Sequence, residues 1–271
     1  MELIEPTKTF FMKKLLIFLM LLTLMAPSSA FSWGSLGHDA SVLIAEKHLT
    51  RKAKKNLAKY LENRPLVYYA SWMDYMGYVT KSGYSNDWFD HCVPVDKAFE
   101  YDEGGFPGDA LMATETAIER LGEGKYKSLD DSTVLLLIKH LVHFVPDMHC
   151  PSHIIYNFRP SNYWVTVGDQ KKLFHGVWDN MLSTGPHEWS ATEWCEFLDR
   201  CTPKEVAKIT EGSPRDWVHD NAAACIIAYD IIRENTTITD PEFYRGNELA
   251  EKQLLKGGLR LAYVLNLIFG R

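Results

Sequence analysis

The sequence has no surplus of positive charge. Its 271 residues include 29 lysines and arginines against 35 aspartates and glutamates, which gives a formal net charge of -6. A protein that grips duplex phosphates with its own side chains normally carries a basic face, so the composition argues against a binder of that kind. Metal ions held by the protein would add positive charge that this sum leaves out.

Cysteine is scarce and odd in number, and no CxxC metal motif is present. The five cysteines are Cys92, Cys150, Cys195, Cys201 and Cys225. An odd count leaves at least one thiol unpaired. Cys195 and Cys201 are close enough along the chain to join the end of a helix by a disulfide, and the sequence leaves this pairing open.

Long apolar runs are absent except near the N-terminus. There the basic sequence MKK at residues 12–14 precedes LLIFLMLLTLMA, which has the length of a signal-peptide core and is short for a membrane span. Small residues allow cleavage after Ala30 or after Ser32, and Met12 is an alternative start. We therefore expect residues 1–32 to be a signal peptide and the protein to be exported, either secreted or periplasmic.

A βαβ alternation and internal repeats are also missing. Apolar residues instead recur at the i, i+3 and i+4 spacing of amphipathic helices, and Asp131-Ser132 would cap one of them. Residues 163–168 alternate as one arm of a short hairpin, and the Gly- and Pro-rich residues 102–109 predict a loop. We predict one all-α domain over residues 33–271, with at most a short β-hairpin. The predicted helices span residues 39–49, 51–62, 108–122, 131–145, 190–200, 203–211, 214–234 and 247–269.

The histidines are unevenly distributed. The segment HFVPDMHCPSH contains His143, Asp147 and His153, and the segment HGVWD contains His175 and Asp179. Residues four apart lie on one helix face, so each His-Asp pair can aim two ligands at one point. One such pair is commonly a surface hydrogen bond. Two pairs in apolar surroundings favour a shared metal ion, because buried His and Asp without partners are costly, and zinc accepts these ligands.

Further segments stand in a recognisable order along the chain. WGSLGH contains Trp33 and His38, ASWMD contains Asp74, and DH contains His91; HFVPDMHCPSH, HGVWD and the C-terminal KGGLRLAYVLNLIF follow. DWVHDNAAAC is a looser match to a further helix. With these pieces the sequence resembles the S1/P1 nuclease family, exported zinc enzymes of fungi, plants and bacteria that are related in fold to bacterial zinc-dependent phospholipase C.

The resemblance implies three zinc ions. One of the implied ligands is the free backbone amine of Trp33, which exists only if cleavage follows Ser32. If Trp33 stayed joined to Ser32, its nitrogen would be an amide, which cannot bind zinc in this way. The implied ligands are Asp74, His91, His143 and Asp147 for one ion, His153, His175 and Asp179 for a second, and the backbone amine and carbonyl of Trp33, His38 and a bridging Asp147 for the third.

The resemblance also implies the reaction. It predicts hydrolysis of single-stranded DNA and RNA and of 3′-nucleotides to 5′-phosphate products, by a hydroxide that the metals hold, without a side-chain nucleophile. We expect a monomer. Two alternatives remain: a phospholipase C-like hydrolase of phospholipid headgroups, and a non-enzymatic exported zinc-binding helical protein. Candidate faces for stacking of unpaired bases are Trp72, Tyr75, Trp88, Phe106, Tyr156, Phe158 and Tyr163.

The chain departs from the family pattern at two places. YNFRPSNYWVTVGDQ stands where the family commonly has a Gly-Gly-Asn loop, and Pro94 stands where it often has an acid. Among the other histidines, we expect His149 to support the metal ligands from behind. His48, His140, His187 and His219 are expected on helix surfaces or in loops.

Overall fold

A computed structural model describes residues 33–74, 90–105, 108–185 and 187–271, and these residues form a mostly helical fold. The predicted signal peptide therefore lies outside the described residues. The fold agrees with the predicted all-α class, and the predicted hairpin is present. The helices are α2 (Ser35–His48), α3 (Arg51–Leu57), α5 (Ala110–Leu121), α6 (Asp131–Asp147), α7 (Phe174–Asp179), α8 (Met181–Thr184), α9 (Ala191–Leu198), α10 (Pro203–Ile209), α11 (Pro214–Cys225), α12 (Ala228–Ile231) and α13 (Asp240–Phe269), with short 3-10 helices at Leu66–Tyr69, Gly122–Ser128 and Pro151–His153.

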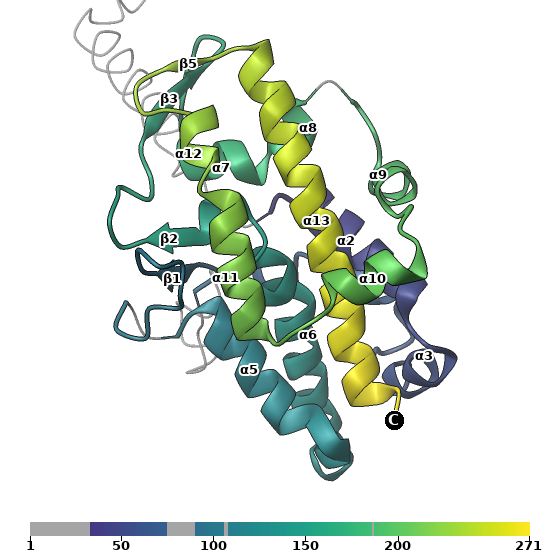
Figure 1. The fold of residues 1–271 in the computed structure, drawn as a ribbon. Helices are drawn as coiled ribbons and strands as arrows, with labels where there is room; N and C mark the ends of the chain where they lie inside the picture. Colours follow the sequence, from purple (N-terminus) through teal and green to yellow (C-terminus); the bar gives the residue numbers. More distant parts are fainter. Residues whose placement is uncertain (1–32, 75–89, 106–107, 186) are drawn as a thin grey trace, which may run out of the picture. The chain divides into compact units, whose positions relative to one another are not determined.

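The long C-terminal helix α13 packs against both α2 and α6 (Figure 1). Two adjacent glycines allow these close approaches. A Cβ atom on Gly258 would lie 2.6 Å from the Ser41 carbonyl oxygen of α2, and one on Gly257 would lie 3.2 Å from the Cα atom of Pro146 in α6. The GG pair of KGGLRLAYVLNLIF thus places α13 between the first helix and the helix that carries His143.

Two small sheets accompany the helices. The hairpin consists of β3 (Trp164–Val167) and β4 (Gln170–Leu173), which are antiparallel, and β5 (Thr237–Ile238) is parallel to β3. The other sheet pairs β1 (Val93–Val95) with β2 (Ile154–Tyr156) in parallel, with Val93 opposite Ile154. This pair was not predicted, because three residues interrupted by a proline are too few to show a strand period.

Several helix boundaries differ from the predictions. The predicted helix 214–234 is interrupted by a turn between α11 and α12. Helix α13 begins at Asp240 rather than at residue 247, because the backbone N–H of Thr239 donates to Glu242 Oε2 at 2.9 Å in a capping box. The cap of α6 is Asp130, whose side chain accepts from the Thr133 N–H at 2.9 Å, and not Asp131-Ser132.

All five cysteine thiols are free, so the structure does not contain a Cys195–Cys201 disulfide. Cys195 is buried in α9, and Cys201 is only partly covered. Within the described ranges, no helix is both long enough and apolar enough to cross a membrane.

Candidate metal centre

Helix α6 supplies the first two candidate ligands, one turn apart. His143 Nε2 lies 3.1 Å from Asp147 Oδ2, and both side chains are buried. The ring of His38 from α2 stacks on that of His143, with centroids 4.4 Å apart, and its Nε2 lies 3.3 Å from Asp147 Oδ1. Asp74 completes this group, with Oδ1 3.5 Å from His143 Nε2. Four residues from three segments therefore point their nitrogen and oxygen atoms at one another.

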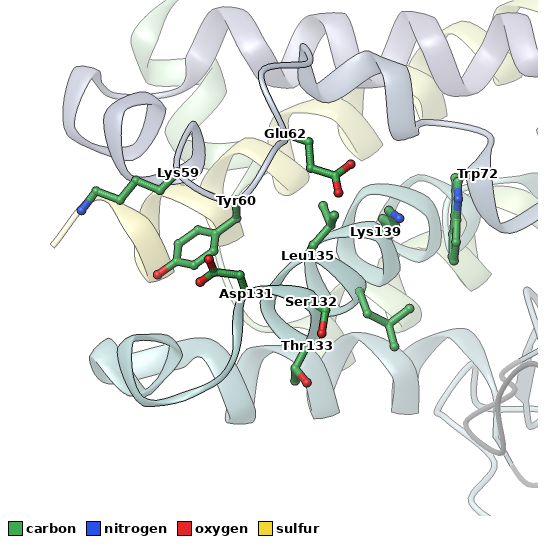
Figure 2. A pocket seen from close by; sticks show the side chains of 10 residues that line it. Lys59, Tyr60, Glu62, Trp72, Asp131, Ser132, Thr133, Leu135 and Lys139 are labelled. Atoms are coloured by element: carbon green, nitrogen blue, oxygen red, sulfur yellow. The ribbon is translucent and has the colours of Figure 1, made fainter.

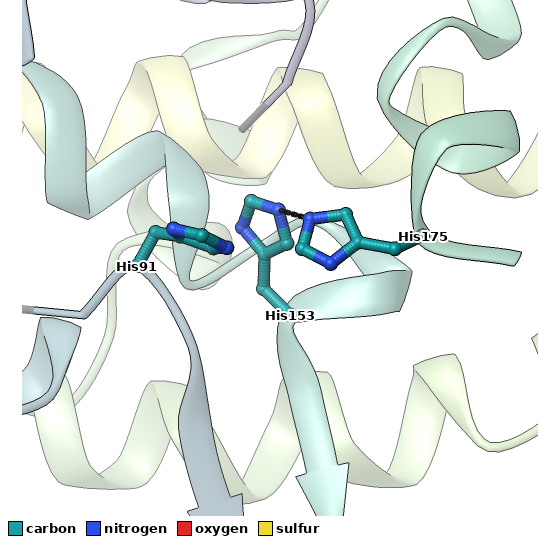
Figure 3. A group of neighbouring side chains, drawn as sticks. All are labelled: His91, His153 and His175. Carbon is teal, nitrogen blue, oxygen red and sulfur yellow. Dashed lines mark hydrogen bonds between the residues drawn. The ribbon is translucent and has the colours of Figure 1, made fainter. Parts of the chain in front are cut away.

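A second group forms around His153. Its Nε2 lies 3.1 Å from His175 Nε2 (Figure 3). The same atom lies 3.4 Å from Asp179 Oδ1. His175 and Asp179 are one turn apart on α7, and His175 Nε2 lies 3.3 Å from Asp179 Oδ2. The ring of His91 lies beside both histidines, 4.6 Å from His153 and 5.1 Å from His175 between ring centroids.

His91 also lies beside the second group. The family resemblance assigns it to the ion of Asp74 and His143, and the structure brings a ligand atom of His91 within 4.8 Å of those of His153 and His175. The β1–β2 register explains the contact. Because Val93 is opposite Ile154, His91 and His153 lie just before paired strands and reach the same end of the small sheet.

Asp147 connects the two groups. One of its oxygens, Oδ1, is 3.3 Å from His38 Nε2 in the first group and 3.6 Å from His153 Nδ1 in the second. Its backbone carbonyl accepts a hydrogen bond from His153 Nδ1 at 3.1 Å. A carboxylate in this position can contact cations on either side, which is the bridging role that the resemblance implies for it.

Backbone carbonyls set the tautomers of two histidines. A carbonyl oxygen only accepts, so His143 Nδ1 donates to Ala70 O at 3.1 Å, and His153 Nδ1 donates to Asp147 O. Burial lowers the pKa of His143 to about 3 and that of His153 well below its usual value, which keeps both rings neutral. Their Nε2 lone pairs then face carboxylate oxygens, an arrangement that a bound cation would stabilise. The donor set therefore fits a metal ion.

The surroundings shift the pKa values of Asp147 and Asp179 in opposite directions. Burial opposes ionisation of Asp147, but the imidazoles of His143, His38 and His153 outweigh it and lower its pKa. Burial, together with the charges of Asp147 and Asp74, raises the pKa of Asp179 well above its usual value. Without a cation, the pocket thus disfavours two ionised carboxylates at once, which a divalent ion would relieve.

The segment that begins at Trp33 reaches the same place. The Gly34 N–H donates to the Asp179 carbonyl oxygen at 2.7 Å, and Trp33 Nε1 donates to Pro146 O at 3.1 Å. The Trp33 side chain is fully buried. The structure therefore places the start of the predicted mature chain between the ends of α6 and α7, which carry Asp147 and Asp179.

Several groups that contact the candidate ligands were not predicted from the sequence. The Ser152 hydroxyl donates to Asp179 Oδ1 at 3.4 Å, and Cys150 Sγ lies 3.8 Å from the same oxygen. The Asn162 side chain accepts from the His175 N–H at 3.1 Å. Cys150 and Ser152 lie inside HFVPDMHCPSH, so their position in the motif was a usable signal; Asn162 had none.

The structure buries two of the other histidines, one of them against expectation. The ring of His149 faces Arg260, whose Nη1 lies 2.9 Å from His149 Nε2, behind the turn that carries Asp147 and His153. His140 is buried against Phe144 instead of lying on a helix surface, because it shares the inward face of α6. The remaining histidines agree with the expectation, with His48 beside Asp199 and His219 beside Glu100.

Two of the four proposed stacking aromatics that the structure describes are buried. Tyr156 and Tyr163 are buried, and their hydroxyls donate to Ala222 O at 2.6 Å and to Ile232 O at 2.5 Å, so both belong to the core. Phe158 is 39% exposed. Trp72 is half-buried under Lys139. Three candidates, Tyr75, Trp88 and Phe106, lie outside the described residues.

A pocket of about 700 Å³ lies beside Trp72 and Lys139 (Figure 2). Its lining includes basic side chains as well as the acidic Glu62 and Asp131, and it includes none of the candidate metal ligands. Lys139 is one helical turn before His143 and holds its ammonium 3.9 Å from the centre of the Trp72 ring. The pocket is therefore separate from the histidine cluster.

A mostly helical fold that gathers buried histidines and aspartates around one carboxylate has the nitrogen and oxygen donors that metal-dependent hydrolases use. A family model described as S1/P1 Nuclease matches residues 33–270, and the chain belongs to this family. The predicted family and the predicted class of enzyme, a hydrolase of phosphodiester bonds, are confirmed.

Curated relatives can be aligned with this chain over nearly their whole length. Endonuclease 2 of Arabidopsis thaliana is 25% identical over 300 residues, covering 95% of this chain and 99% of the relative. Endonuclease 3 of the same plant is 26% identical over 271 residues, covering 89% and 90%. Nuclease S1 of Aspergillus oryzae (strain ATCC 42149 / RIB 40) is 23% identical over 284 residues, covering 91% and 95%.

Proposed function

We propose that the protein is a zinc-dependent nuclease that hydrolyses single-stranded DNA and RNA and 3′-nucleotides to 5′-phosphate products. The observation that carries the proposal is the joining of two His-Asp groups by Asp147, with imidazole lone pairs directed at carboxylate oxygens. When bound, zinc polarises a phosphoryl oxygen and allows water to lose a proton near neutral pH. The protein supplies the ligands and a buried setting.

The proposed ligands are the nine residues that the resemblance assigns to three ions. Asp147 would bridge, and the backbone carbonyls of Ala70 and Asp147 would hold the rings of His143 and His153 with Nε2 toward the metal. The place of Trp33 beside Pro146 and Asp179 supports a ligand role for its freed amine. The nine residues are Trp33, His38, Asp74, His91, His143, Asp147, His153, His175 and Asp179.

This site also accounts for an acidic protein that acts on a polyanion. Three zinc ions carry six positive charges, whereas the proposed ligand carboxylates are Asp74, Asp147 and Asp179. A site of this kind attracts phosphate through its metals and needs no basic face. We further propose that the protein is exported after cleavage behind Ser32 and acts as a monomer.

The test uses purified protein expressed with its own N-terminal segment, so that processing can occur. It is incubated with single-stranded DNA, RNA, a 3′-nucleotide and phosphatidylcholine, with and without a chelator and added zinc. We expect chelator-sensitive cleavage of the nucleic acids and release of phosphate from the nucleotide. Hydrolysis of phosphatidylcholine without cleavage of the single-stranded nucleic acids would contradict the proposed substrate. Full activity of the metal-free protein would contradict the proposed dependence on zinc. N-terminal sequencing should begin at Trp33.

A further inference from the structure

The turn that joins Asp147 to His153 is held by side chains from two other helices. Asn221 of α11 donates its Nδ2 hydrogen to Met148 O at 2.9 Å. Gln253 of α13 donates from Nε2 to His149 O at 3.4 Å. Two successive carbonyl groups of the turn are therefore bound by amide side chains that come from distant parts of the sequence.

Arg260 of α13 extends this network to the ring of His149. A guanidinium group only donates, so Arg260 Nη1 donates to His149 Nε2 at 2.9 Å, and His149 Nδ1 donates to Val145 O at 2.7 Å. Arg260 Nη1 also lies 3.2 Å from Asn221 Oδ1, which accepts from Gln253 Nε2 at the same distance. The three side chains form one connected unit around the turn.

The Arg260 side chain is only 4% exposed, and its guanidinium group is hydrogen-bonded within the protein. Its Nε donates to Ile209 O at 2.9 Å, and its Nη2 lies 2.7 Å from Asp220 Oδ2. Burying a charged side chain is expensive unless it is paired and hydrogen-bonded, and these contacts meet that requirement. Gly257 lets α13 come this close, because a Cβ atom there would lie 3.2 Å from the Pro146 Cα atom, just before the turn.

We infer that Arg260, together with Asn221 and Gln253, positions the turn so that Asp147 and His153 meet at the spacing seen here. The turn carries one ligand of each group at its two ends. A shift of about 1 Å in such a scaffold is enough to impair a preorganised site. The inference rests on the proposed metal site and assigns a task to the C-terminal motif KGGLRLAYVLNLIF, which contains none of the ligands. The three side chains are positioning residues, since none of them is among the proposed ligands.

The test compares zinc affinity in Arg260→Met with that in Arg215→Met. Arg215 is an exposed arginine paired with Glu103 and Glu115, so its replacement makes the same change in charge away from the turn. We expect Arg260→Met to bind zinc about 10- to 100-fold more weakly in competition with a chelator, as for other groups that hold ligands from behind. The Arg215 variant should stay within about twofold of wild type.

A purely structural role predicts a different result. It would lower the melting temperature of the metal-free protein while zinc affinity stayed unchanged, and that outcome would overturn the inference. If Arg260→Met does not fold, zinc affinity is measured in Gln253→Met instead, because this variant removes only the amide contacts of Gln253 and keeps the arginine. Unchanged zinc affinity in Gln253→Met would also refute the inference. A wild-type protein that binds zinc but cleaves no nucleic acid would contradict the proposed function and leave the positioning role measurable. One that binds no zinc would overturn both.

Discussion

Replacing Gly34 by alanine is expected to disturb the site through the backbone of Asp179. A Cβ atom on Gly34 would lie 2.8 Å from the Asp179 carbonyl oxygen and 3.3 Å from Asn180 Oδ1. An unstrained carbon contact needs about 3.4 Å or more, so the two segments must separate by roughly 0.6 Å. That movement stretches the hydrogen bond from Gly34 N to Asp179 O, which is 2.7 Å long.

The expected cost follows from these two effects. Overpacking costs about 1–3 kcal/mol, and a weakened hydrogen bond adds about 1 kcal/mol. For a domain of this size each kcal/mol lowers the melting temperature by about 2–4 °C, so we expect a fall of roughly 5–15 °C. Zinc affinity should fall as well, because the displaced carbonyl belongs to a proposed ligand.

The assay is thermal unfolding of the zinc-loaded and metal-free forms, followed by circular dichroism, with zinc content measured in parallel. Gly176→Ala is the matched control, because Gly176 lies on α7, the helix that carries Asp179, and no atom outside the adjoining helix backbone lies within 4 Å of the added carbon. It should be neutral or stabilise the helix by up to about 1 kcal/mol. Gly34→Ala with the melting temperature and zinc content of wild type would refute the reasoning.

Three further results are expected. His143→Ala should weaken zinc binding and cut nuclease activity by more than about 100-fold, whereas His219→Ala, which removes an exposed partner of Glu100, should leave both near wild type; equal effects would contradict the proposed centre. Chelation should lower the melting temperature and added zinc should restore it in a concentration-dependent way, since metal binding stabilises the folded state; an unchanged melting curve would count against a resident metal. Denatured, unreduced protein should titrate as five thiols, and a value of three would indicate a disulfide such as Cys195–Cys201.

Local spacing was sufficient to find the helical ligand pairs. His143 with Asp147 and His175 with Asp179 are four residues apart, and the geometry of a single helix brings each pair together whatever surrounds it. The first arm of the hairpin, predicted over residues 163–168, was likewise visible from its period of two. Family resemblance then added Trp33, His38, Asp74 and His91, which no periodicity connects to the helices.

Contacts between distant segments could not be found in this way. His91 lies beside His153 because two three-residue strands pair in one register, and such short strands have no detectable pattern. The burial of two candidate stacking residues could not be predicted for a related reason. Helices α11 and α12 and the segment after them cover Tyr156 and Tyr163, and the sequence around these tyrosines does not indicate that contact.

The amino-acid sequence alone was enough to define a mostly helical chain and two ligand-bearing helix turns, because these depend on neighbours within a few residues. The order of short motifs along the whole chain was enough to indicate the family. The tertiary structure decided which histidines share a group, which carbonyls orient their rings, and that Arg260 faces the turn between Asp147 and His153. Those contacts join residues far apart along the chain, and only the packing of α13 against α2 and α6 determines where they meet.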